Sequence, residues 1–122
     1  MNLAKADKAF SEYIRRRDAD HRGFVQCCTC PTVRHWKEMD CGHWLLRGNL
    51  ATRFDERNSH AQCRECNSHH DGQWVKHRAY IIERYGEDAL WQLGLTKVST
   101  LKLMQFEIDE ITKKYKDKIK TL

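Results

Sequence analysis

The sequence lacks any apolar run that approaches the roughly 20 residues of a membrane-spanning helix, and its first residues lack the apolar stretch of a signal peptide. It has one proline, Pro31, and no repeat, low-complexity tract or linker. These absences argue against a membrane protein, a secreted protein and a chain of several domains. We therefore expect a cytoplasmic protein without membrane contact, in which the six cysteines are metal ligands before they are disulfides.

A strong excess of one charge is also missing: 22 Lys and Arg residues stand against 17 Asp and Glu, for a formal net charge of +5. This mild excess is compatible with a polyanionic partner but does not identify one. The C-terminal lysines are expected to form a solvated helix face. The better candidates for contacts with phosphate groups are the arginines nearest the motifs described below, which are Arg47, Arg53, Arg57 and Arg64.

At 122 residues, of which 40% are hydrophobic, the chain predicts one α+β domain, residues 1–122, with a modest core. Apolar periodicity and turn residues locate its elements. In the first half we expect a helix over 2–19, a short β-hairpin with a metal-binding turn over 24–47 and an irregular loop over 48–61. In the second half we expect a helix from about Cys66 to Tyr85 ending at Gly86, a short helix from Asp88 to Leu93 and a long helix over 97–120.

The long C-terminal helix carries an apolar stripe at three- and four-residue spacing, formed by Leu101, Met104, Ile108, Ile111, Tyr115 and Leu122. Such a stripe has two interpretations. It can pack against helix 2–19 of the same chain, or it can form a dimer seam of the coiled-coil type. The stripe is too short to decide between them.

Four cysteines have the spacing of a structural zinc site. Zinc takes four tetrahedral ligands, and a Cys-x-x-Cys pair brings two sulfurs to one ion from a tight turn. Cys28 competes with Cys27 as the partner of Cys30, but Cys27 reproduces the spacing of the second pair. A redox dithiol is the alternative, although no βαβ pattern surrounds either pair. The predicted zinc ligands are Cys27, Cys30, Cys63 and Cys66.

A second group of residues has the chemistry of a catalytic metal site. His43 follows Asp40 by three residues, and Asn67 follows the last cysteine. Closing the zinc site should therefore bring Asn67 near the strand that carries Asp40 and His43. Carboxylate and amide oxygens suit Mg²⁺ or Mn²⁺. His43 would be the general base that takes a proton from an attacking water.

The order of these motifs resembles that of the HNH, or ββα-metal, nucleases, and especially the phage NinG (Rap) recombination endonuclease family. Two segments are also similar to phage endonuclease VII, namely Asp40 to His43 and Cys66-Asn67. The resemblance to NinG runs from about Ala9 to near the C-terminus. It is carried by Cys27…Cys30, Trp36…Asp40-Cys41-Gly42-His43-Trp44, Arg53-Phe54-Asp55-Glu56-Arg57-Asn58-Ser59-His60 and Gln62-Cys63…Cys66-Asn67-Ser68-His69.

The resemblance implies a zinc-bound HNH core over 24–85, flanked by helices, in a metal-dependent endonuclease. Its substrates would be branched DNA, such as Holliday junctions and D-loops, during phage recombination in a bacterial host. Asn58 would match the middle Asn of HNH, which braces the loop and orients the catalytic histidine. His69 and His70 are alternative further metal ligands. Because junction resolution needs two cuts, a homodimer is expected.

Two rival functions remain open from the residues alone. One is an HNH nuclease that nicks or cuts ordinary duplex DNA, and the other is a non-catalytic zinc-binding nucleic-acid module. Trp74 and Trp91 are expected in the core, and Trp44 is expected to pack rather than stack on an unpaired base. His60 either orders its loop or contacts DNA. The histidines expected on the surface are His21, His35 and His77.

Overall fold

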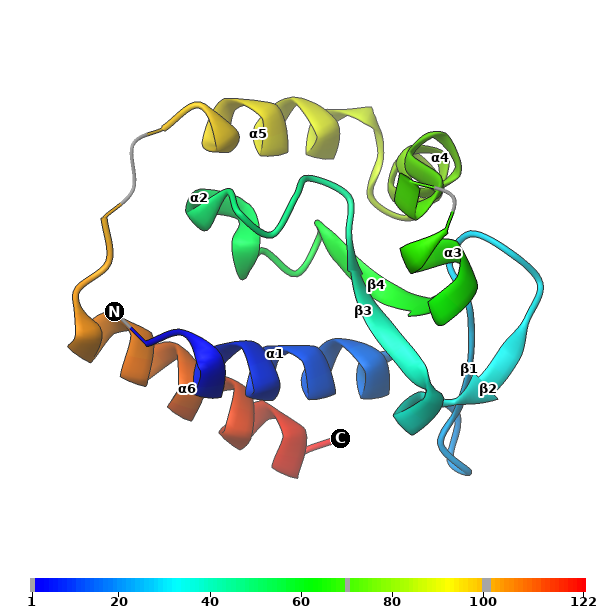
Figure 1. Cartoon of the computed structure of the whole chain (residues 1–122), viewed down its shortest axis with the longest axis horizontal. Coiled ribbons are helices and arrows are strands. Elements are labelled where there is room, and N and C mark those ends of the chain that lie inside the picture. Colours follow the sequence, from blue (N-terminus) through cyan, green and yellow to red (C-terminus); the bar gives the residue numbers. More distant parts are fainter. Residues whose placement is uncertain (1, 70, 100–101) are drawn as a thin grey trace.

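Two helices from opposite ends of the sequence, α1 (Ala4–Arg17) and α6 (Gln105–Lys120), lie side by side along one edge of the molecule (Figure 1). The computed structural model describes residues 2–69, 71–99 and 102–122. The Asn2 main-chain N–H donates to Gln105 Oε1 at 3.2 Å, which ties the two N-termini together. The helices therefore run in the same direction, as Figure 1 also shows.

The apolar stripe of α6 is buried against α1. Tyr115 lies edge-on to Phe10, with ring centroids 4.9 Å apart, and Ile111 packs on the same cluster. The stripe therefore packs within the chain, which is the first of the two interpretations. Helix α6 begins later than the predicted residue 97. Met104 and Leu122 are exposed, and Leu101 lies outside the described residues.

Two small antiparallel sheets stand beside α1. Strands β1 (Phe24–Gln26) and β2 (Val33–His35) form a hairpin around the first Cys pair, as predicted, but this hairpin ends at His35 and does not extend to residue 47. A short 3₁₀ turn, η1 (Trp36–Glu38), leads into β3 (Met39–His43). Strand β3 pairs with β4 (Ser59–Cys63), so that Met39 lies opposite Cys63 and His43 lies opposite Ser59. The site-bearing strand thus belongs to a second sheet.

The prediction of an irregular loop over 48–61 is wrong, because this segment contains helix α2 (Leu50–Arg53) and most of β4. Every residue of β4 is buried, yet Ser59, His60 and Gln62 are polar. The sequence therefore lacks the alternation of apolar and polar residues that would predict a strand. Hydrogen bonds compensate for the burial of His60 and Gln62. Gln62 Nε2, for example, donates to Thr29 Oγ1 at 3.0 Å and to the Gly72 carbonyl at 2.8 Å.

The helix predicted from Cys66 to Tyr85 is interrupted. It consists of α3 (Arg64–Ser68), the 3₁₀ turn η2 (Asp71–Gln73) and α4 (Trp74–Tyr85), which ends at Gly86 as expected. The break lies where Asp71, Gly72 and Gln73 all adopt positive φ angles of 50–66°. Helix α5 (Glu87–Lys97) then continues beyond the predicted Asp88–Leu93 and passes through Gly94.

Three predictions of burial on α4 and α5 are wrong. His77, expected on the surface, is 1% exposed. Trp74 and Trp91, expected in the core, are 48% and 72% exposed. Trp44 is packed as expected and stacks on Trp74, with ring centroids 5.1 Å apart. None of the helices in the described ranges is long and apolar enough to cross a membrane.

His60 orders the core and does not reach the surface. It is 1% exposed, and its Nδ1 lies 2.9 Å from Nε2 of His77. Burial lowers the pKa of His60 to about 2 and that of His77 to about 4. Both imidazoles are therefore neutral in the folded protein, and one shared N–H joins them.

Acidification is expected to destabilise the fold through this pair. Unfolded histidine titrates near pH ~6.5, so below that pH the unfolded chain binds protons that the folded chain does not. The free energy of unfolding should then fall with pH by up to about 1.4 kcal/mol per unit for each histidine. Urea unfolding between about pH 7.5 and about pH 5.5 measures this slope. His77→Gln should reduce the slope of unfolding free energy against pH by about one proton. An unchanged slope would contradict the conclusion that His77 is neutral in the folded protein.

Candidate functional site

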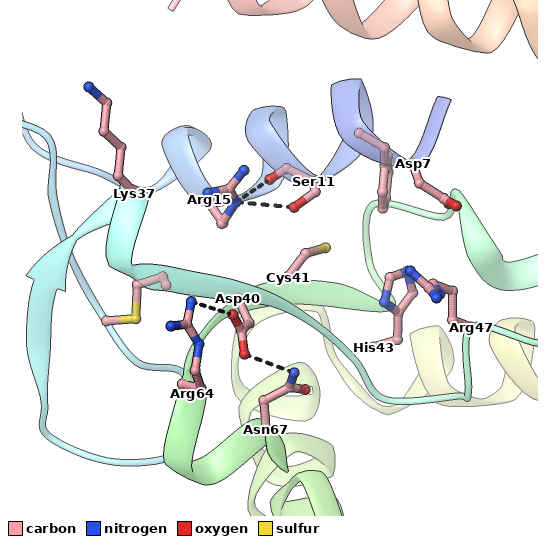
Figure 2. Close-up of a pocket in the computed structure, with 12 residues that line it drawn as sticks. Asp7, Ser11, Arg15, Lys37, Asp40, Cys41, His43, Arg47, Arg64 and Asn67 are labelled. Atoms are coloured by element: carbon pink, nitrogen blue, oxygen red, sulfur yellow. Dashed lines mark hydrogen bonds and ion pairs between the residues drawn. The ribbon is translucent and has the colours of Figure 1, made fainter. Parts of the chain in front are cut away.

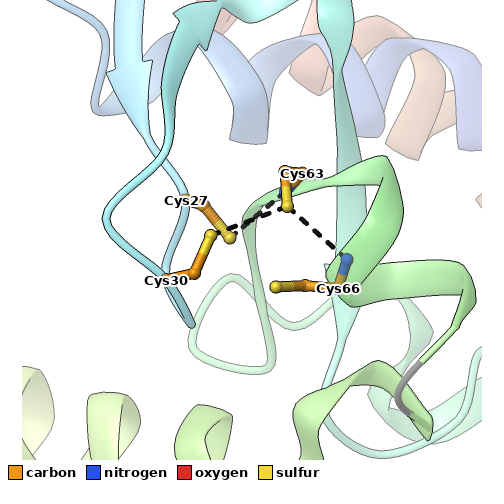
Figure 3. Close-up of side chains that lie close together, drawn as sticks. All are labelled: Cys27, Cys30, Cys63 and Cys66. Atoms are coloured by element: carbon orange, nitrogen blue, oxygen red, sulfur yellow. Dashed lines mark hydrogen bonds between the residues drawn. The ribbon is translucent and has the colours of Figure 1, made fainter.

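Four cysteine sulfurs converge where the first hairpin meets the start of α3 (Figure 3). All four Sγ atoms lie within 4.8 Å of one another, and Sγ of Cys30 and Cys63 are 3.7 Å apart. Tetrahedral zinc with Zn–S bonds of about 2.3 Å places its sulfurs about 3.8 Å apart. The cluster contains Cys27 and not Cys28, as the spacing predicted, and it can hold a structural zinc ion.

Hydrogen bonds prepare the Cys27 sulfur to be a thiolate, the form that binds metal, whereas burial raises the pKa of Cys63 and Cys66. Sγ of Cys27 accepts N–H groups from Cys63 at 3.2 Å and Thr29 at 3.4 Å. The side-chain hydrogen bond from Cys28, followed by those of Thr29 and the amides, lowers the pKa of Cys27 to about 3. The cluster pins the end of β1 to the junction of β4 and α3, and this junction positions the next site.

A polar cavity of about 350 Å³ lies between α1, β3 and α3 (Figure 2). It unites residues that are far apart in the sequence. Five of the residues that line the cavity were predicted from the motifs: Asp40, His43, Arg47, Arg64 and Asn67. Those that sequence reasoning did not assign to the site are Asp7, Ser11, Arg15 and Lys37.

Asp40 and Asn67 are in direct contact at one end of this cavity. Asn67 Nδ2 donates to Asp40 Oδ2 at 3.2 Å, and Arg64 Nη2 approaches Asp40 Oδ1 at 3.4 Å (Figure 2). Asn67 directly follows the buried Cys66, so the cysteine cluster fixes its position, as predicted. The side chain of Arg64 is 72% exposed, so its ion pair with Asp40 stabilises the fold little.

Gly42 is required between the two key residues of β3. A Cβ at this position would lie 2.2 Å from Gln62 Oε1 and 3.0 Å from Gln62 Cβ. Gln62 is buried and held by its own hydrogen bonds, so it cannot move aside easily. The close approach of β3 to Gln62 therefore depends on glycine.

His43 is oriented as a hydrogen-bond donor at one nitrogen, which leaves the other as an acceptor. Its Nε2 lies 2.9 Å from the carbonyl oxygen of Arg53. Because a carbonyl can only accept, Nε2 must carry the proton, and Nδ1 of the neutral ring then keeps its lone pair. Burial lowers the pKa of His43, and the positive charge of Arg47 lowers it further. The ring is therefore neutral near pH 7, as a general base must be.

Asn58 braces the loop that carries this carbonyl. It is 0% exposed, and its Oδ1 accepts from the Leu45 N–H at 2.8 Å. Its Nδ2 donates to the carbonyls of Leu45 at 3.0 Å and Thr52 at 3.4 Å. Asn58 thus ties the chain after β3 to Thr52 of α2, the residue before Arg53. It acts on His43 only through this loop.

Two of the four predicted phosphate-binding arginines are engaged inside the fold. Arg53 forms an ion pair with Asp7 of α1, and its Nε donates to Asp7 Oδ1 at 2.9 Å. Arg57 pairs with Asp55 at 3.0 Å and also donates to Gln92. Neither lines the cavity, whereas Arg47 and Arg64 do.

Only one of the two further histidines predicted as alternative metal ligands lies in the described ranges, and it is not placed in this cavity. His69 is exposed at the end of α3 and does not line it. His70 lies outside the described residues. Among the residues that the structure describes, His43 is the histidine that lines the cavity.

Helix α1 supplies the roof of the cavity through one polar face. Asp7, Ser11 and Arg15 follow one another at four-residue spacing, which places them on the same side of the helix. Arg15 Nε donates to the carbonyl and Oγ of Ser11 at 3.1 Å each, and its Nη1 donates to the Trp36 carbonyl at 3.2 Å. This polar stripe was readable in the sequence, beside the apolar stripe that faces α6.

The fold and the site together define a small α+β protein with a four-cysteine metal-binding cluster beside a cavity lined by Asp, His and Asn. The chain belongs to the NinG family: the family described as "Bacteriophage Lambda NinG protein" matches residues 2–122. The resemblance inferred from the motifs is thereby confirmed at the family level.

Several phage proteins called "Protein ninG" are similar to this chain. That of Escherichia phage 933W is 32% identical over 124 residues, which cover 98% of this chain and 57% of the phage protein. That of Salmonella phage P22 is 38% identical over 85 residues, 69% of this chain and 39% of the relative. That of Escherichia phage lambda is 35% identical over 89 residues, 72% and 41% respectively. The chain thus spans little more than half the length of the first of these relatives, and no solved structure matches it.

Proposed function

We propose that this protein is a metal-dependent endonuclease of the HNH type that cleaves branched DNA, such as Holliday junctions and D-loops, during phage recombination in the host cytoplasm. The observation that carries the proposal is the cavity of Figure 2, which combines an Asp40–Asn67 pair with a neutral His43 whose Nδ1 carries the lone pair that can accept a proton. Branched DNA as substrate rests on the resemblance to the recombination endonucleases.

Asp40 and Asn67 are the residues that would hold the catalytic metal. Their contacting side-chain atoms are 3.2 Å apart, close to the separation of two neighbouring ligands of an octahedral Mg²⁺ at about 2.1 Å. Rotation of the Asn67 amide would present its oxygen in place of its nitrogen. When bound, Mg²⁺ or Mn²⁺ supplies positive charge to stabilise the scissile phosphate and the leaving 3′ oxygen. Arg64 would then release Asp40 and become available to a phosphate.

His43 activates the nucleophile. The oxygen of a water attacks phosphorus, the bond from phosphorus to the 3′ oxygen breaks, and the proton of the water passes to Nδ1. The carbonyl of Arg53 holds the ring in the tautomer that can receive this proton. Arg47 and Lys37 line the same cavity and place positive charge where a DNA strand would enter.

Resolution of a junction needs two cuts, so we propose a homodimer with two sites. The stripe of α6 is buried against α1, so another surface would join the two copies. Sedimentation of the zinc-loaded chain at assay concentration tests this proposal, and a monomer bound to a cleaved junction would contradict it.

Cleavage of a four-way junction in added Mg²⁺ or Mn²⁺, compared with linear duplex of the same sequence, tests the function. Asp40→Asn should slow junction cleavage at least about 100-fold, because the metal supplies several kcal/mol of charge stabilisation. The zinc content should stay unchanged, because Asp40 is not part of the cysteine cluster. Asp117→Asn, an exposed carboxylate on α6, is the matched control and should cleave normally.

Two outcomes would favour the rival functions. Equal rates on junction and linear duplex would indicate a nuclease for ordinary duplex DNA. DNA binding without cleavage in either metal would indicate a non-catalytic zinc-binding module.

A further inference from the structure

A second cavity of about 490 Å³ lies between α4 and α5, and its lining is rich in indole rings. It contains three of the four tryptophans of the chain, Trp44, Trp74 and Trp91. Trp74 is 48% exposed and Trp91 72% exposed, although side chains of this size are usually covered. We call this cavity the tryptophan groove.

Trp44, at the inner side of this groove, carries an unused hydrogen-bond donor. It is 8% exposed, and its Nε1–H has no partner among the described residues. Buried indole N–H groups usually find an acceptor, so an unpaired one is unfavourable. This nitrogen has no exposed surface of its own, so a ligand in the groove would contact the exposed rings of Trp74 and Trp91. A nucleobase offers a flat ring that can stack on such indoles.

The charged residues of the groove fit the same ligand. Arg78 of α4 lines it and makes no ion pair or hydrogen bond within the described ranges. A free guanidinium suits a phosphate or the face of a base. Glu87, in the first turn of α5, also lines the groove and can accept a hydrogen bond from an exocyclic amino group.

The groove and the polar cavity are connected along the chain by two consecutive residues. His43 lines the polar cavity, and Trp44, the next residue, lines the tryptophan groove. The Trp44 main-chain N–H donates to the carbonyl of Asn58 at 2.9 Å, which fixes this segment. One fixed segment therefore supplies a side chain to each of the two cavities.

We propose that the tryptophan groove binds an unpaired nucleobase of branched DNA, stacked against Trp91 and Trp74, with Arg78 contacting the adjacent backbone. This inference rests on the proposed nuclease function and applies to branched DNA with unpaired bases, such as the displaced strand of a D-loop. In a continuous duplex each base is already stacked and paired, so it cannot enter the groove. Stacking on an aromatic side chain contributes roughly 5- to 150-fold in affinity per base, equivalent to about 1–3 kcal/mol.

Binding of the zinc-loaded chain to two labelled duplexes, without added Mg²⁺ or Mn²⁺, tests this inference. The duplexes have the same sequence, and one carries a short bulge of unpaired thymines. Wild type should bind the bulged duplex more tightly and its tryptophan fluorescence should be quenched. Trp91→Ala should weaken binding to the bulged duplex at least about fivefold and leave binding to the paired duplex unchanged. Because Trp91 is largely exposed, this change should not unfold the chain.

Val75→Ala is the matched control, since Val75 is 75% exposed on α4 and does not line the groove. Equal effects of Trp91→Ala on both duplexes, or no effect on either, would overturn the inference. Loss of a dimer in Trp91→Ala, with unchanged preference for the bulge, would overturn it in favour of a second copy of the chain as the occupant.

The binding measurement does not depend on cleavage. If Trp91 controls the preference for the bulge while wild type cuts no DNA, the groove is supported and the nuclease proposal fails. If wild type cuts junctions while Trp91→Ala keeps the full preference, the nuclease proposal stands and the groove inference fails.

Discussion

Cys63→Ser is expected to unfold the protein at ambient temperature. Cys63 is the last residue of β4 and the cap of α3, and its sulfur lies 3.7 Å from that of Cys30. Serine cannot replace a thiolate as a zinc ligand. A structural zinc contributes on the order of 10 kcal/mol or more to folding, which equals the whole stability of a typical small domain. Without it, nothing covalent or metallic joins β1 to α3.

Circular dichroism and zinc content measure this effect. Wild type should be helical and hold one zinc per chain, whereas Cys63→Ser should lose both helicity and metal. Cys28→Ser is the matched control, because Cys28 lies in the same turn and outside the cluster. It should keep the zinc and lose at most about 1 kcal/mol of stability. A folded Cys63→Ser chain with a wild-type urea midpoint would show that the cluster is not a structural zinc site.

The cysteine ligands could be predicted because their information is local. Each pair is defined by a two-residue spacing, and the match between the pairs selected Cys27 over Cys28. The same holds for helix α1, whose apolar positions recur at helical spacing. The stripe of α6 was equally visible, but its partner was not, because pairing within or between chains depends on where a distant helix lies.

Strand β4 and the break before α4 could not be predicted for a different reason. Burial of β4 depends on hydrogen bonds such as those of His60 and Gln62, which come from residues distant in sequence. The break at Gly72 requires positive φ angles in its two neighbours, Asp71 and Gln73, which periodicity does not reveal. The predictions for His77 and Trp74 failed for a simpler reason: they followed from residue type, which does not reveal that α4 buries the histidine and exposes the indole.

The candidate site was predicted in part. Asp40, His43 and Asn67 were selected by their chemistry and by their distance in sequence from the cysteines, and they line one cavity. The contribution of α1 was missed, because a helix classified by its apolar face was not searched for a second, polar one. The ion pair between Arg53 and Asp7 was not predicted for the same reason, because Asp7 lies on that polar face of α1.

His43→Ala is expected to abolish DNA cleavage while the fold is retained. General-base catalysis contributes roughly 10²–10⁴-fold in rate, and alanine has no group to receive the proton. The structural cost is small, because the lost hydrogen bond to the Arg53 carbonyl is worth only about 1 kcal/mol. His43 and the cysteine ligands thus have opposite expected effects: one removes activity from a folded protein, and the others remove the fold.

Single-turnover cleavage of a four-way junction, measured as a function of pH, checks this prediction. In wild type the rate should fall as the pH drops through the pKa of His43, and burial places this pKa below the ordinary value near ~6.5. Any residual cleavage by His43→Ala should lack this acidic limb. His21→Ala is the control, since His21 is exposed and lies outside the cavity. If His43→Ala lost zinc and helicity as Cys63→Ser is expected to do, the histidine would belong to the scaffold. The proposed nuclease would then have no general base.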